Sequence, residues 1–99
     1  RSEVAARRSM SYDVEFDRHG YDQYQRLSDS HPWYMDDVDR FLRELGESPI
    51  DHGRRNPAGG SIAVHHIICG NSEFDLVVCY EYGQDEAHIV ITEIRIAWP

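Results

Sequence analysis

The sequence predicts an α+β domain with the element order β-α-α-β-β-β, built on a small antiparallel sheet. Three β-rich segments follow one another between Ser61 and Trp98: SIAVHHIIC, FDLVVCYEY and HIVITEIRIAW. Each is dense in β-branched and aromatic residues and is bounded by Gly, Asn, Ser or Asp, as expected of strands joined by short turns. The chain upstream has first a two-residue and then a helical periodicity. We therefore expect one strand and two helices before an antiparallel meander.

The upstream elements follow from the spacing of apolar residues. SYDVEFD (11–17) alternates apolar and acidic residues, which indicates a strand with one buried face. RHGYDQYQRLS (18–28) has apolar side chains three residues apart and predicts a short helix. A second helix begins at Ser30 or His31, has Pro32 in its first turn and ends at Gly46. Its apolar residues keep the helical spacing: Tyr34, Val38, Phe41, Leu42 and Leu45.

Length and composition indicate one cytoplasmic domain over residues 10–99. Residues 1–9 are polar and lack periodicity, so we interpret them as a disordered arm or an upstream remnant. No apolar run of about 18 residues is present, which predicts no membrane span. Cys69 and Cys79 are expected on neighbouring strands, with Cys79 opposite residue 63 or 64 and too far from Cys69 for a disulfide. Two reduced thiols fit a reducing compartment.

The charge balance limits the classes of partner. The chain has 18 acidic and 10 basic residues, a net charge of −8, and every basic residue is Arg. A broad nucleic-acid-binding surface is not expected, because such binding draws on Lys and Arg that neutralise phosphates. The absence of Lys excludes a catalytic lysine. No local spacing indicates a metal site, a nucleophile or a phosphate cradle, so no metal and no cofactor are predicted.

One face of the predicted sheet carries candidate catalytic residues. A three-residue turn, Gly70–Ser72, would place Ile62, Val64, His66 and Ile68 in the core, with His66 as a hydrogen-bonded core histidine, whereas a change of one residue in the turn would exchange the two faces. The opposite face would then gather these residues: His65, Asp75, Glu81, Glu93 and Arg95. His65, Glu81 and Glu93 with Arg95 could form an acid/base set beside an anion-binding arginine. The alternative is a solvated face on which Arg95 pairs with Asp75 across strands.

The segment SPIDHGRRNPAGG (48–60) is a loop by composition and is the one place where basic residues adjoin within the predicted domain. Arg54 and Arg55 are therefore candidate anion-binding residues, with plain surface as the alternative. Trp33, Tyr34 and Met35 at the head of the second helix are either an exposed hydrophobic anchor for a partner or part of the core.

The element order over residues 10–98 resembles that of the RelE/ParE superfamily of bacterial toxins. The resemblance rests on LRELGESP at the end of the second helix, the Gly/Pro-rich loop, VVCYEY and ITEIRI. It implies helices packed on one face of the sheet and a groove where ribonuclease members cleave ribosome-bound mRNA. Arg95 matches the late arginine of that family, Tyr80 lies where its strand tyrosine usually sits, and His65 or His66 falls where a basic residue is expected.

The chain departs from that pattern at Asp75 and Glu81, where 74–82 carries no basic residue. The departure predicts weakened or lost ribonuclease chemistry, whereas ParE-like members, whose target is DNA gyrase, need no ribonuclease site. The resemblance implies a cognate antitoxin as partner, with the ribosome and its mRNA or gyrase as target. The alternative class is a non-catalytic acidic protein-interaction module that offers its negative face to a basic partner.

Overall fold

The computed structural model describes residues 12–99 except residue 86, so the predicted arm at residues 1–9 lies outside the described residues. The elements are β1 (Asp13–Phe16), α2 (Arg18–Ser30), η1 (Pro32–Tyr34), α3 (Met35–Glu47), α4 (Pro49–His52), β2 (Gly53–Arg55), β3 (Ser61–Cys69), β4 (Ser72–Tyr82) and β5 (His88–Ala97). No described helix is both long and apolar enough to cross a membrane.

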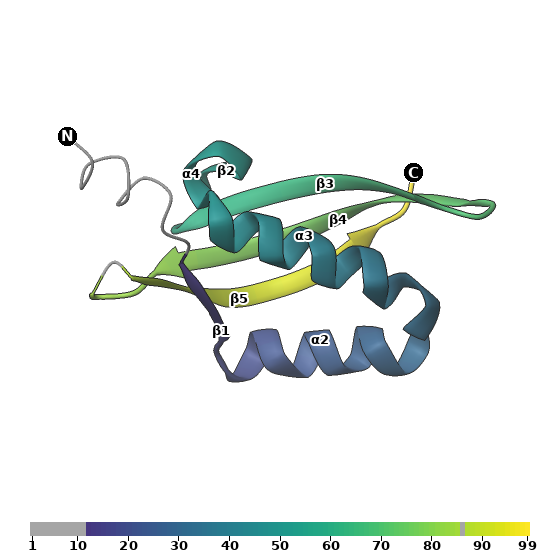
Figure 1. The fold of residues 1–99 in the computed structure, drawn as a ribbon, viewed down its shortest axis with the longest axis horizontal. Coiled ribbons are helices and arrows are strands. Elements are labelled where there is room, and N and C mark those ends of the chain that lie inside the picture. The colour runs from purple at the N-terminus through teal and green to yellow at the C-terminus, as the bar shows by residue number, and fades with distance from the viewer. Residues whose placement is uncertain (1–11, 86) are drawn as a thin grey trace.

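The strands form one sheet in the order β1-β5-β4-β3-β2, and α2 and α3 lie on one side of it (Figure 1). The α+β class and the one-sided helices are confirmed. The purely antiparallel sheet is wrong, because β1 pairs parallel with β5. A parallel pair needs a long connection, and here almost the whole domain lies between the two strands. The predicted loop at 48–60 is also wrong in part, since it contains α4 and β2.

Both long helices are positioned by features visible in the sequence. The Asp17 carboxylate caps α2 by accepting a hydrogen bond from the Gly20 N–H at 2.7 Å. Gly20 lies against the Ile91 carbonyl, so α2 approaches β5 more closely than a side chain would allow. The apolar stripe predicted for the second helical segment is confirmed as buried: Tyr34, Val38, Phe41, Leu42 and Leu45. The predicted start at Ser30 or His31 is wrong, because Ser30 ends α2, Pro32–Tyr34 form the 3-10 helix η1 and α3 begins at Met35.

The turn between β3 and β4 contradicts the predicted register. Cys69 pairs with Ser72, so the turn has two residues, Gly70 and Asn71, and Gly70 has a φ of 61°. The three-residue turn was wrong by one residue, and a shift of one residue exchanges the two faces of a strand. Val64, His66 and Ile68 therefore lie on the uncovered face, with Val64 46% and Ile68 69% exposed. Their odd-numbered neighbours face the helices.

The hairpin between β4 and β5 keeps its predicted loop but not its predicted pairing. The loop spans 83–87, as expected. Asp75 faces Ala97 and Val77 faces Arg95, so the expected pairing of Asp75 with Arg95 is wrong. A bulge at Cys79/Tyr80 shifts the register beyond that point. Cys79 lies opposite Ile62 on β3, also unlike the prediction, and both cysteines are free thiols.

Candidate functional site

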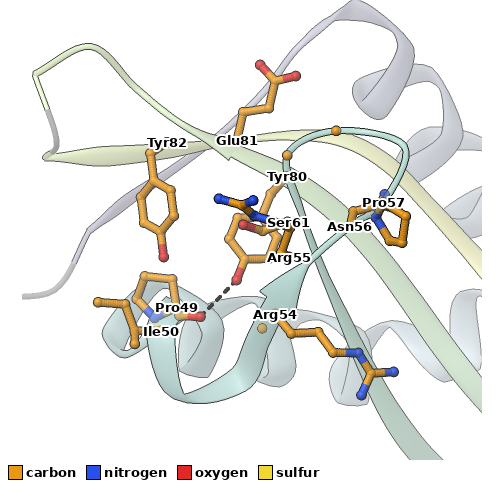
Figure 2. Close-up of a pocket in the computed structure, with 13 residues that line it drawn as sticks. Pro49, Ile50, Arg54, Arg55, Asn56, Pro57, Ser61, Tyr80, Glu81 and Tyr82 are labelled. Carbon is orange, nitrogen blue, oxygen red and sulfur yellow. Dashed lines mark hydrogen bonds between the residues drawn. The ribbon is translucent and has the colours of Figure 1, made fainter.

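An open groove of about 710 Å³ lies where α4, β2 and the last residues of β4 meet. Its lining comes from three stretches of chain that the sheet and the α4 turn bring together (Figure 2). The residues that line it are Pro49, Ile50, Gly53, Arg54, Arg55, Asn56, Pro57, Gly59, Gly60, Ser61, Tyr80, Glu81 and Tyr82. The predicted anion-binding residues Arg54 and Arg55 and the tyrosine that matches the family pattern, Tyr80, thus all line the groove, with Glu81 beside them.

Tyr80 forms the floor of the groove and connects α4, which forms one wall, to β4 of the sheet. Its side chain is 1% exposed, and its hydroxyl donates a hydrogen bond to the Pro49 carbonyl at 2.8 Å. A β-carbon on Gly53 would overlap this hydroxyl, so glycine is required there for the contact. Burial raises the pKa of Tyr80 to about 12, and the hydroxyl stays protonated near neutral pH. Its proton is engaged by the chain's own backbone, which makes Tyr80 a support for the groove.

The two arginines leave β2 on opposite sides. Arg55 pairs with Ser61 and Arg54 with Ile62, so alternation puts Arg55 on the face of Tyr80 and Arg54 on the uncovered face. In Figure 2 the Arg55 side chain extends into the groove, whereas Arg54 points away from it. None of the ion pairs between described residues includes either arginine. Arg55 is therefore the positive charge that a ligand in the groove would meet.

The apolar part of the groove is exposed. Ile50 is 74% and Tyr82 41% exposed, and Figure 2 shows the Tyr82 ring pointing toward Pro49 and Ile50. A guanidinium beside an accessible aromatic ring and an aliphatic side chain can hold an anionic group whose neighbour is apolar. The groove thus has the composition of a binding site.

The four predicted catalytic residues do not form one cluster. His65 lies on the helix-covered face, where its ring stacks on Phe41 with centroids 4.5 Å apart. Glu81, Glu93 and Arg95 lie on the opposite, uncovered face. Their predicted grouping with His65 is wrong because the two-residue turn places the odd-numbered residues of β3 under α3.

Arg95 is already paired on that face. Its Nε donates to the Glu93 carboxylate at 2.9 Å, and both groups are accessible to water. The predicted pairing of Arg95 with Asp75 is wrong, because Asp75 binds His66 instead. An exposed pair of this kind contributes between about 0 and 1 kcal/mol to stability.

Sequence reasoning missed a cluster around His66. The His66 Nδ1 lies 2.9 Å from an Asp75 oxygen, and its Nε2 lies 2.8 Å from a Glu73 oxygen. Hydrogen bonds raise the pKa of His66 above its usual value, and the bond with Asp75 contributes more than the bond with Glu73. The predicted core histidine is wrong, since this side chain is exposed. The Gly-Asn pair after Cys69, a common two-residue turn, was the available signal.

A second missed feature is an aromatic cluster at the end of the sheet away from the groove. The His31 ring lies 5.8 Å from Trp33 and 6.2 Å from Trp98, between centroids. Trp33 is 63% and Trp98 54% exposed, while Tyr34 is buried. Trp33 is therefore an exposed side chain and not part of the core.

Among residues 12–85 and 87–99, no three His, Cys, Asp or Glu side chains are placed to hold a metal ion.

No protein-family model matches the chain, and comparison with curated proteins and with solved structures also finds no match.

Tyr80→Phe tests the support of the groove. Removing the hydroxyl leaves the buried Pro49 carbonyl without its partner, so we expect the free energy of unfolding to fall by about 1–3 kcal/mol. Urea titration measures this loss. Tyr82→Phe is the matched control, because it removes a hydroxyl from an exposed ring. Equal effects of the two substitutions would contradict the assigned role of Tyr80.

The His66 cluster predicts a pH dependence with a definite sign. Because the folded-state pKa is raised, its stabilising contribution is fully present below the unfolded-state pKa, about 6.5, and is lost as the pH rises through the folded-state value. NMR titration of the imidazole should show the raised pKa. Asp75→Asn should lower it, and by more than Glu73→Gln does. A His66 pKa that is unchanged in Asp75→Asn would disprove the assignment.

Proposed function

We propose that the chain is a RelE/ParE-like toxin-superfamily domain of a toxin–antitoxin system that acts in the cytoplasm by binding a protein target and does not cleave RNA. The observation that carries the proposal is the sheet with α2 and α3 on one side of it, because helices on one face of the sheet are what the resemblance to the superfamily implies. The open groove at the end of this sheet supplies a binding site. A cognate antitoxin would bind the domain and neutralise it.

The arrangement of polar groups supports binding over ribonuclease chemistry. General acid–base catalysis needs the acid and the base within reach of one substrate. His65 and the pair of Glu81 and Glu93 lie on different faces of the sheet, and the Arg95 guanidinium is neutralised by Glu93. A net charge of −8 also opposes docking on RNA phosphates.

The groove supports a protein target with an acidic surface. Arg55 enters it, Arg54 stands beside it, and Ile50 and Tyr82 offer apolar contact area. Arginine and tyrosine are among the residues that contribute most to protein–protein binding. DNA gyrase is the target that the resemblance to ParE-like members implies, and the ribosome is the target that RelE-like members imply.

The second candidate function is a non-catalytic acidic protein-interaction module. It is favoured by the uncovered face of the sheet, where acidic side chains gather on β4 and β5: Glu73, Asp75, Glu81 and Glu93. Such a face would bind a basic partner through charge complementarity.

Inducible expression in a bacterial host separates the two functions. We expect growth arrest, and we expect Arg55→Ala to relieve it because the groove loses its positive charge. Arg40→Ala is the matched control, since it removes the same charge from an exposed helix site paired with Asp37. An expressed chain with no effect on growth would favour the interaction module.

Ribosome-associated mRNA from the arrested cells tests the absence of cleavage. We expect intact transcripts with the unchanged chain and with Arg95→Ala. Transcript cleavage that disappears in Arg95→Ala would contradict a function without ribonuclease activity.

A further inference from the structure

The backbone at the two edges of the sheet is covered to different extents. At one edge β1 pairs with residues 88–91 of β5, and beyond it the Gln23 side-chain oxygen accepts a hydrogen bond from the Ile94 N–H at 2.7 Å. At the other edge β2 covers only Ser61–Ala63 of β3. In the described part of the chain, no strand follows residues 64–69 along this edge (Figure 1). Beyond β1 the edge of β5 lies against α2, whereas residues 64–69 at the other edge, the open edge, have no neighbouring strand among the described residues.

The open edge presents backbone groups at every second residue. In a two-residue hairpin, the pair that closes the turn is hydrogen-bonded, so Cys69 bonds to Ser72 on β4. The same holds for the alternate residues before it, His65 and Ile67. The N–H and C=O groups of Val64, His66 and Ile68 therefore point away from β4, toward the open edge.

The same three residues place their side chains on the uncovered face. Val64 and Ile68 are exposed aliphatic residues, four positions apart, on either side of His66. Glu73 and Asp75 lie next to His66 on the same face, so the cluster is net negative even when the imidazole is protonated. Backbone groups, apolar side chains and negative charge thus coincide over five residues.

We propose that residues 64–68 are the docking site for an extended segment of a basic partner protein, which adds to the sheet as a further strand beside β3. Main-chain hydrogen bonds to Val64, His66 and Ile68 supply affinity in this mode, and side chains on alternate residues supply specificity. Two aliphatic residues four positions apart in the segment would cover Val64 and Ile68. A Lys or Arg midway between them, on the same face of the added strand, would meet the carboxylates of Glu73 and Asp75.

Charge excludes a second copy of this chain as the occupant. Antiparallel pairing of two β3 strands about His66 would bring together two clusters that are each net negative. It would also bring Cys69 of one copy against the strand that covers Ala63 in the other. This docking site does not depend on the toxin proposal, because peptide binding to the purified chain is measured without any readout of toxicity.

The test uses the full chain and a synthetic acetylated peptide, Lys-Val-Thr-Lys-Thr-Ile-Lys, with amide hydrogen exchange followed by NMR. At saturating peptide we expect exchange at Val64, His66 and Ile68 to slow by about tenfold or more. Exchange at His65 and Ile67, which are already bonded to β4, should change little. No slowing at the three outward amides would overturn the proposal. Protection that rises with protein concentration in the absence of peptide would overturn it in favour of a second copy.

Two substitutions of the same kind locate the binding. Ile68→Lys should weaken peptide affinity by about tenfold, because it removes an apolar contact and adds like charge. Ile50→Lys, at a similarly exposed isoleucine in the groove, should leave the affinity unchanged. The reverse result would place the peptide in the groove. Equal or tighter binding of the peptide with Glu in place of Lys would overturn the basic character of the partner.

Discussion

The rest of the structure depends on the two-residue turn at Gly70 and Asn71. Gly70 adopts the left-handed conformation that such a tight turn requires, and Cys69 is thereby held opposite Ser72. Because side chains alternate along a strand, this one pairing decides which half of β3 faces the helices. Ala63 and Ile67 enter the core, and Val64 and Ile68 remain in solvent. The small side chain of Ala63 and the flat imidazole of His65 lie on the covered face, where α3 packs.

At the other end of the hairpin, the sheet supports the groove through a buried tyrosine. The bulge at Cys79/Tyr80 lets β5 keep Ile91 on the covered face although the pairing has shifted. Tyr80 then lies below α4 and binds the Pro49 carbonyl, while Gly53 leaves room for its hydroxyl. Arg55 enters the groove from the next strand. The turn and the bulge thus place the binding groups at opposite ends of one sheet, the groove at one and the open edge beside the other.

Residue patterns predicted the helices and strands better than they predicted how the strands pair. The helical spacing from Val38 to Leu45 located α3 and its buried face, because that periodicity is local. The parallel pairing of β1 with β5 has no local signal, since strand direction is decided by the path of the chain between them. The predicted register of β3 was wrong because the turn after Cys69 has two residues, one fewer than predicted. Arg54 and Arg55 were found from their position in a Gly/Pro-rich loop, whereas the structural role of Tyr80 depends on its contact with Pro49, which the sequence does not reveal.

The most direct test of this account is the set of cross-strand NOEs between the backbone protons of β3 and β4 in the uniformly labelled chain. We expect contacts that join Ala63 to Val78, His65 to Leu76 and Ile67 to Phe74. Contacts that join His66 to Leu76 and Ile68 to Phe74 would indicate a turn longer by one residue. They would move His66 and Ile68 into the core, and both the open docking edge and the separation of His65 from the glutamates would be contradicted.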